Sequence, residues 1–419
     1  MVRSEGEPED LRSEMDALSA NKTGAASAHI ALSAPDVTDA EIDAVTAVMR
    51  TPHLSLGPEL AAFESSLADY HSVPHAIAVS SGTAGLHMAL LTLGIGEGDE
   101  VIVPSFAFIA VANAVLLVGA VPVFADIDPA TLNLMRSTVE EVLTTRTRAI
   151  LVVHTFGIPA DVPALRELAT HHELVIIEDA CEAIGAEIHR RRVGTFGDLS
   201  VFGFYPNKQI TTGEGGAVLA HTDAHADRLR SLRNQGRGRV FRGEEEGRYF
   251  NLIPPPAMSS SSDWLHHLDI GFNYRLSDIA CALGRVQLSR LDEILTLRRT
   301  AAERYQTLLS DIPGLELPPL TLPGLTISWF VYVVRLREGS DRAAIQEFLT
   351  KRGIATSTYF APIHQQPAWR EYVASAPPSL PVTQSIGART LALPFFNRIT
   401  EQQQQQVAAA LREATALHN

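Results

Sequence analysis

Residues 101–125, VIVPSFAFIAVANAVLLVGAVPVFA, carry no charged side chain and decide the fold class of the chain. The run divides into strand-like VIVP, helix-like IAVANAVLLVG and strand-like VPVFA. An uncharged run of this length could also cross a membrane. It is interrupted, however, by Pro104, Asn113, Gly119 and Pro122. We therefore interpret it as a buried β–α–β unit, with a membrane span as the less favoured alternative.

Apolar segments of the same kind recur from Ala76 onward and alternate with helical stretches. They are AIAVS, EVIVP, VPVFAD, RAILVVH, ELVIIED and LSVFGF. Their apolar residues are nearly continuous, which is typical of strands that helices cover on both faces. This alternation predicts an α/β fold with a mostly parallel, doubly wound sheet flanked by helices. Ligands of such sheets bind beyond the carboxyl ends of the strands.

The length of 419 residues suffices for a large domain and a smaller one. Residues 1–28 are small, polar and charged, and they predict a disordered tail. Residues 29–295 are assigned to a large, ligand-binding domain. Within it, residues 236–267 predict a long surface loop, because they hold an acidic triplet, three prolines and a serine run. Residues 296–419 predict a smaller C-terminal α/β domain.

Two helices have boundaries that can be predicted from the sequence. The first, in VTDAEIDAVTAVM, begins with a capping box at Thr38–Glu41. Its spacing places Ile42, Val45 and Met49 on one face. The second is expected to be one long helix over residues 277–309, which begins at the serine or a neighbour.

The net charge, the cysteine count and the first residues argue against several classes of function. The net charge of −14 argues against a nucleic-acid partner, because binding a phosphate backbone requires a concentrated basic surface. The two cysteines, Cys181 and Cys281, lie far apart, so neither a disulfide framework nor a thiolate metal site is expected. The acidic first residues, MVRSEGEPEDLRSEMD, contain no secretory signal. We expect a cytoplasmic protein without metal, membrane or nucleic acid.

Three polar features follow predicted strands. In VIIEDACEAIG, Asp179 either caps the next helix or faces a cationic heterocycle. In AIAVSSGTAGLHMAL, the turn at residues 80–84 is either an ordinary helix cap or a cradle for a phosphate. In FGFYPNKQITTGEGG, Lys208 either extends to the surface or forms an imine with an aldehyde.

The combination of the three features is more specific than any one of them. The phosphate turn, Asp179 and Lys208 occur in this order, and each follows a strand of one predicted sheet. Pyridoxal phosphate requires a grip on its phosphate, a carboxylate at its ring nitrogen and a lysine for its aldehyde. The sequence therefore predicts a pyridoxal phosphate site at the carboxyl edge of the sheet.

From residue 29 to the C-terminus, the chain resembles the DegT/DnrJ/EryC1/StrS family of sugar aminotransferases, which have fold type I of the aspartate aminotransferase superfamily. The resemblance rests on a series of motifs that occur in the family's order. They are GPELAAFE, SSGTAGLHMAL, PSFAFIAVANAV, PVFADIDP, EDACEAIGA, FYPNKQITTGEGG, GFNYRLSDIACALGRVQLSRLDE, YFAPIHQQP and LPFFNRIT. The set is specific for the family and does not identify one substrate.

The resemblance implies a role for each matching cofactor residue. Lys208 matches the lysine that forms the Schiff base, and Asp179 matches the acid that pairs with the pyridine nitrogen. Gly82, Thr83 and Ala84 match the turn that binds the cofactor phosphate.

Further matches concern the ring, the subunit interface and the substrate. Phe108 matches the aromatic residue that stacks on the cofactor ring. Asn273 matches an asparagine that reaches the partner subunit's phosphate, which implies a homodimer with composite active sites. Tyr205 and His364 are assigned to the substrate by position.

The sequence departs from the commoner family pattern at two positions. Many relatives have a serine five residues before the lysine, where this chain has Gly203. One phosphate hydrogen bond must then come from water or backbone. The position three after the aspartate is often His or Gln near the ring hydroxyl, and here it is Glu182. An ionised Glu182 would repel the cofactor's phenolate unless it is protonated or paired.

The resemblance implies a transfer of an amino group from glutamate or glutamine to a nucleotide-linked keto-deoxysugar, with Lys208 moving the proton. A keto-cyclitol acceptor and a non-catalytic pyridoxal-phosphate-binding protein are alternatives. A dehydratase relative would carry His in place of Lys208. A transcription regulator would need a DNA-binding domain, for which the short acidic segment before His29 has no room.

Overall fold

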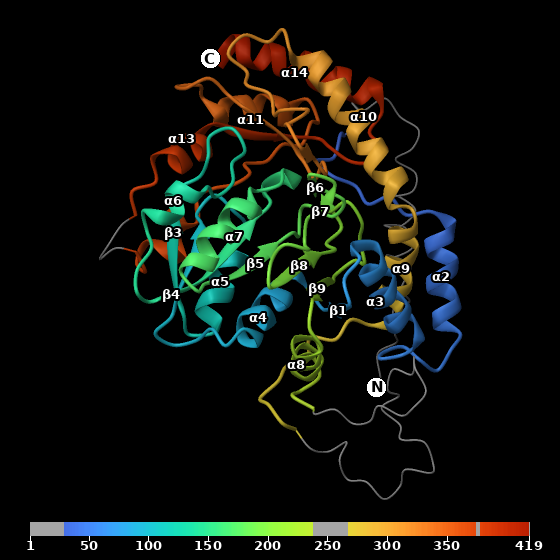
Figure 1. Cartoon of the computed structure of the whole chain (residues 1–419). Helices are drawn as coiled ribbons and strands as arrows, with labels where there is room; N and C mark the ends of the chain where they lie inside the picture. Colours follow the sequence, from blue (N-terminus) through green and yellow to red (C-terminus); the bar gives the residue numbers. More distant parts are fainter. Residues whose placement is uncertain (1–28, 238–266, 374–377, 419) are drawn as a thin grey trace, which may run out of the picture.

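The computed structural model describes residues 29–237, 267–373 and 378–418. Its centre is a seven-stranded sheet in the order β1-β9-β8-β5-β4-β2-β3 (Figure 1). The strands are β1 (His75–Val79), β2 (Glu100–Pro104), β3 (Val121–Ala125), β4 (Thr147–Val153), β5 (Val175–Asp179), β8 (Leu199–Gly203) and β9 (Gly216–Ala220). Every pair is parallel except the two that β9 makes with its neighbours. The prediction of a mostly parallel sheet is confirmed.

Helices cover both faces of this sheet, as the continuous apolar strands predict. One apolar core joins the sheet to α4 (Gly82–Thr92), α5 (Ala110–Leu117) and α8 (Asp223–Arg233). The other joins it to α3 (Pro58–His71), α6 (Arg136–Glu140), α7 (Val162–His171) and α9 (Asp278–Ser289).

The uncharged run at 101–125 forms β2, α5 and β3, so the interpretation as a β–α–β unit is confirmed. No helix in the described ranges is long and apolar enough to cross a bilayer.

The C-terminal part of the chain has an apolar core of its own. This part of the chain contains α10 (Leu291–Leu309), α11 (Arg342–Lys351), α13 (Pro381–Arg389), α14 (Glu401–His418) and the antiparallel pair β11 (Tyr332–Arg335) and β12 (Thr390–Leu393) (Figure 1). Ile30 joins this core through a bridge to Ile354. The separate core is consistent with a smaller domain, and the boundary at residue 295 stays a prediction.

Short elements complete the described structure. A three-stranded sheet consists of β6 (Glu187–Ile188), β7 (Arg191–Arg192) and β10 (Leu325–Thr326). The remaining helical turns are η1 (Thr155–Gly157), η4 (Ile363–Gln365) and α12 (Pro367–Arg370). The predicted tail at 1–28 lies outside the described residues, as does the predicted loop at 236–267 except for its ends.

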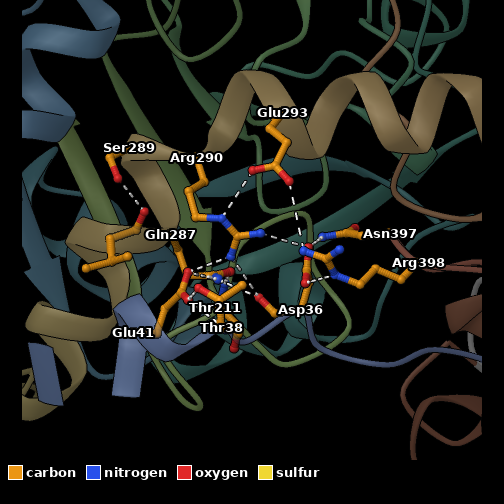
Figure 2. Close-up of polar contacts among 11 residues, drawn as sticks. Asp36, Thr38, Glu41, Thr211, Gln287, Ser289, Arg290, Glu293, Asn397 and Arg398 are labelled. Carbon is orange, nitrogen blue, oxygen red and sulfur yellow. Dashed lines mark hydrogen bonds and ion pairs between the residues drawn. The ribbon is translucent and has the colours of Figure 1, made fainter. Parts of the chain in front are cut away.

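The prediction of one continuous helix over residues 277–309 is wrong. Ser277 caps α9 as expected, but α9 ends at Ser289 and α10 begins at Leu291. Figure 2 shows a cluster of charged side chains around the intervening Arg290. The Arg290 guanidinium binds the carboxylates of Asp36 (3.1 Å) and Glu41 (2.7 Å). These partners come from the N-terminal segment, so no local pattern indicates the break.

The N-terminal helix α2 (Asp39–Met49) begins with the predicted capping box, in which Thr38 and Glu41 satisfy each other's polar groups. The face that the spacing predicted, however, is only partly covered, with Val45 half-buried. Ile42 and Met49 are 54% and 57% exposed, whereas Glu41 and Val48 are the buried residues of this helix. The apolar face of α2 therefore lies on the surface.

Candidate active site

The predicted site residues follow β1, β5 and β8, which run in the same direction. Because β9 is antiparallel to both β1 and β8, those two strands are parallel to each other and end at the same edge of the sheet. Contacts confirm the convergence: a Cβ added at Gly82 would lie 2.7 Å from Sγ of Cys181 and 3.6 Å from Cα of Gly203. The turn after β1, the segment after β5 and the end of β8 therefore meet at one point.

The turn after β1 forms the start of helix α4. The Ser81 hydroxyl accepts a hydrogen bond from the Ala84 N–H at 3.1 Å and caps the helix. The N–H groups of Gly82 and Thr83 are in the first turn, where no preceding helical carbonyl can accept from them. Gly216 lies against this turn, and a Cβ there would come within 2.8 Å of the Gly82 nitrogen. The turn is a suitable cradle for an anion.

Asp179 is the last residue of β5, and its side chain is buried. One carboxylate oxygen, Oδ1, accepts from the Cys181 N–H at 3.0 Å. The preceding Glu178 has its carboxylate on the other side, where it binds His154 (3.1 Å) and accepts from Gly194 (2.9 Å). The alternation of a strand thus directs Asp179 toward the site and Glu178 into a structural network.

Lys208 follows β8 and its amine is mostly enclosed, with 15% of the side chain exposed. The amine lies 3.4 Å from Oε1 of Glu182 and 4.0 Å above the ring of Phe330. An acid and an aromatic face therefore hold this ammonium group in place. The alternative that Lys208 extends freely to the surface does not fit this geometry.

Glu182 is buried beside Lys208, and its Oε2 accepts a hydrogen bond from the Phe156 N–H at 2.9 Å. Burial raises the pKa of the Glu182 carboxyl, and the nearby charge of Lys208 offsets only part of that rise. The negative charge of Asp179 raises the pKa further. The charges of Asp179 and Lys208 therefore act on Glu182 in opposite directions.

Two aromatic candidates lie on the open side of the site. Phe108 is 61% exposed, and Tyr205 is 53% exposed. The carbonyl of Tyr205 accepts the Lys208 N–H at 2.9 Å, which forms the turn that carries the lysine. A large apolar ring left exposed after β2 is available for stacking on a planar ligand.

His364 and Asn273 lie on other segments of the chain, with contacts of their own. The buried His364 ring binds the Ser105 hydroxyl through Nδ1 at 2.7 Å, and burial lowers its pKa. These contacts anchor the segment after β2, and the assignment of His364 to substrate stays a prediction. Asn273 is exposed and pairs with Asn234 next to the end of β1, where Ser80 donates to the Tyr274 carbonyl at 2.8 Å.

These residues fit pyridoxal phosphate by the chemistry of their donor groups. The helix start at Gly82 offers N–H groups to a phosphate, Asp179 offers a carboxylate to a protonated ring nitrogen, and Lys208 offers an amine to an aldehyde. All three are at one edge of the sheet. Across the described ranges, no group of three or more His, Cys, Asp or Glu side chains is placed to hold a metal ion.

The doubly wound sheet with this donor set defines a protein of the fold-type-I aminotransferase class. A profile of the DegT/DnrJ/EryC1/StrS aminotransferase family matches residues 35–412. The chain belongs to this family and is an aminotransferase. The resemblance stated from the motifs is thereby confirmed.

Relatives cover nearly the whole chain. GDP-perosamine synthase of Caulobacter vibrioides is 38% identical over 386 residues, which are 91% of this chain and 97% of that protein. The erythromycin biosynthesis sensory transduction protein EryC1 of Saccharopolyspora erythraea is 37% identical over 85% of this chain and 90% of its own. The structure of DesV of S. venezuelae, in complex with a ketimine intermediate, has 35% identity and a TM-score of 0.78, and covers 97% of both chains.

Several residues of the site were not predicted from the sequence. Phe330 lies under the amine, and Arg298 binds the Lys208 carbonyl at 3.0 Å. Gln209 donates to the carbonyl of Glu182 at 2.6 Å and to the hydroxyl of Ser328 at 2.9 Å. Phe330 and Ser328 belong to the apolar stretch SWFVYVVRL at residues 328–336, whose aromatic residues were the available signal.

Proposed function

We propose that this aminotransferase uses pyridoxal phosphate to move an amino group from glutamate or glutamine to the keto group of a nucleotide-linked deoxysugar. The observation that carries the proposal is the enclosed amine of Lys208, held between Glu182 and Phe330 at the sheet edge that also carries Asp179. The name of the Caulobacter vibrioides relative, GDP-perosamine synthase, supports a nucleotide-linked sugar as acceptor.

Each residue that binds the cofactor has its own role in this proposal. Pyridoxal phosphate, when bound, supplies an aldehyde that links to amines and a ring that delocalises negative charge. The Asp179 carboxylate keeps a proton on the ring nitrogen, because a buried opposite charge favours the charged form. The start of α4, at Gly82, Thr83 and Ala84, binds the phosphate, with the N–H groups of Gly82 and Thr83 as donors. Phe108 covers one face of the ring.

Lys208 has two roles in this proposal. Its amine holds the cofactor in the resting protein, and an incoming donor amine displaces it. The freed Nζ then accepts the proton from the α-carbon of the donor and acts as a general base. Glu182 lies 3.4 Å from this amine and places a carboxyl group beside the ammonium group that forms there.

The proposed link between Lys208 and the cofactor can be tested by labelling, because the chain has only three lysines, Lys22, Lys208 and Lys351. Borohydride treatment of the loaded protein and peptide mapping should label Lys208 alone. Lys351, which is 72% exposed and paired with Glu347, is the internal control. Lys208→Ala should abolish the label, the visible absorbance of the bound cofactor and transamination together. A label on Lys351 only, or normal turnover of the variant, would contradict the proposal.

The donor and the acceptor need a separate experiment. The loaded protein should be incubated with glutamate or glutamine, and the 2-keto acid should be measured. Keto-sugar nucleotides and keto-cyclitols should then be compared as acceptors. Turnover with keto-cyclitols alone would overturn the proposed acceptor, and the absence of any keto acid would favour a non-catalytic binding protein.

We also infer a homodimer in which each subunit completes the other's site. The exposed apolar face of α2, with Ile42 and Met49, is a surface that a second copy could cover. Asn273 is exposed beside the cradle and is assigned to the partner's phosphate. Mixing Lys208→Ala subunits with Asn273→Ala subunits should restore one intact site per mixed dimer. Full activity of a monomer would refute the inference.

A further inference from the structure

Arg298 has an unusual environment for an arginine. It lies on α10, is 2% exposed and is among the largest fully buried side chains. Within the described part of the chain it makes no ion pair with a carboxylate. Burial lowers the pKa of its guanidinium to about 9, so the group is still charged at neutral pH. A buried cation without a paired acid is unfavourable unless other groups compensate it.

The compensating groups are three main-chain carbonyls. The Nη1 of Arg298 donates to the carbonyls of Trp329 (3.3 Å) and Phe330 (2.9 Å). The Nη2 donates to the carbonyl of Lys208 at 3.0 Å. The planar guanidinium fixes the directions of its N–H groups, so one side chain sets the position of two segments at once.

Both of these segments contact the reactive amine. Lys208 carries the amine, and the ring of Phe330 lies 4.0 Å below it. The Lys208 N–H is held by the Tyr205 carbonyl, and the following Gln209 is held by Ser328. Within the described residues, the carbonyl of Lys208 accepts only from Arg298. The guanidinium therefore joins the main chain of Lys208 directly to that of Phe330, beside the link that Gln209 makes to Ser328.

We propose that Arg298 is a positioning residue, which fixes the main chain of Lys208 and the ring of Phe330 together and so aims the amine at the cofactor. This inference rests on the proposed function of Lys208. Arg298 belongs to α10, whose second half packs in the C-terminal core. The orientation of the amine is thus coupled to a helix that packs in the C-terminal core.

A double-mutant cycle on cofactor binding tests this proposal. Apo protein is titrated with pyridoxal phosphate, and the dissociation constant is measured for Arg298 and Arg298→Met, each with Lys208 and with Lys208→Ala. We expect Arg298→Met to weaken binding about tenfold when Lys208 is present and less than about twofold when it is absent. Equal weakening in both backgrounds would overturn the proposal, because Arg298 would then support only the general fold.

Two further variants complete the experiment. Arg298→Lys keeps the positive charge and loses the planar guanidinium, so it should show the same selective weakening of cofactor binding. It replaces Arg298→Met in the double-mutant cycle if that variant does not fold. Arg304→Met is the matched control, since Arg304 lies on the same helix and donates to the Ile399 carbonyl at 3.1 Å. It should leave cofactor affinity unchanged in both backgrounds, and a selective effect of Arg304→Met would count against a specific role of Arg298.

The outcomes separate this inference from the proposed function. Absence of a borohydride label on Lys208 in the unaltered protein would overturn the function and the inference together. If Lys208 is labelled but the effects of the Arg298 and Lys208 substitutions on cofactor binding are additive, only the role of Arg298 would be overturned. If Lys208 is labelled and Arg298→Met weakens cofactor binding only when Lys208 is present, both the function and the inference would be supported.

Discussion

The carboxylate of Glu182 lies 3.4 Å from the amine of Lys208, and both groups are shielded from solvent. Glu182 also accepts from the main chain of Phe156. In the protein without cofactor, the Lys208 ammonium thus compensates part of the buried negative charge of Glu182. This pairing also makes the charge state of Glu182 a determinant of stability when no cofactor is bound.

We expect Glu182→Gln to raise the thermal unfolding midpoint of the apo protein at neutral pH. Burial raises the pKa of Glu182 above its ordinary 4.5. Its contribution to stability is therefore complete below pH 4.5 and is lost as the pH rises through the higher folded-state value. The gain from Glu182→Gln should accordingly disappear in acid. A midpoint that falls at neutral pH would show that the ion pair with Lys208 outweighs burial.

Phe108→Ala should weaken pyridoxal phosphate binding about tenfold and leave the stability of the apo protein nearly unchanged. The ring is 61% exposed, so its removal leaves no cavity. Stacking on a planar ligand would be lost. Titration with cofactor and thermal unfolding measure the two effects. Leu117→Ala, at a side chain 60% exposed, is the control and should change neither. Unchanged cofactor affinity of Phe108→Ala would remove this residue from the site.

Gly203 and Cys181 should behave as a coupled pair. A Cβ at Gly203 would lie 3.2 Å from Sγ and 3.3 Å from Cβ of Cys181, which is closer than most such contacts. We expect Gly203→Ser alone to weaken cofactor binding by about threefold to tenfold through crowding. With Cys181→Ala added, the space opens and the serine hydroxyl can reach the cradle, so binding should return at least to its original strength.

The cycle of four proteins, measured by cofactor titration, checks this coupling. Cys181→Ala by itself should have a small effect, because burial raises the pKa of the thiol and keeps it uncharged. If Gly203→Ser has the same effect with and without Cys181, the two side chains do not compete for the same space.

Glu41→Gln should destabilise the protein at neutral pH and much less in acid. Burial alone would raise the pKa of Glu41, but hydrogen bonds from Thr38, Arg290 and Gln287 lower it to about 2 (Figure 2). The ionised form therefore stabilises the fold above pH 4.5, and this contribution is lost as the pH falls through the lower value. We expect a loss of about 2–3 kcal/mol at pH 7.

Urea unfolding at about pH 7 and about pH 3 measures this difference. Glu140→Gln is the control, because Glu140 forms an exposed pair with Arg136 and such pairs contribute little. An equal loss from Glu41→Gln at both values of pH would show that packing, not charge, is responsible.

The strands and the central residues of the site could be predicted because their signals are local. The apolar run that forms β5 ends at Asp179, and the strand before Lys208 is equally continuous. Since parallel strands end at one edge, the order of the motifs was sufficient to bring the carboxylate and the amine together. The capping box at Thr38–Glu41 is likewise read from neighbouring residues.

The remaining features depend on contacts between distant segments. Arg298 lies 90 positions from Lys208, in a charged helical stretch that resembles a solvated surface. The break at Arg290 has no proline or glycine, and the acids that bind this side chain lie more than 240 positions away. Strand β9 was not predicted, because the short GAVLA follows a glycine-rich segment that the motifs had already assigned to the site.

Strand β9 has a consequence for the evolution of the site. It pairs along its whole length with β8 and with β1, so residues 204–215 form the tip of a hairpin whose two stems are fixed inside the sheet. An insertion or deletion of one residue in these stems would turn every side chain of the strand to the opposite face. Relatives that accept other substrates should therefore keep the length of this hairpin and vary segments that end at the rim instead.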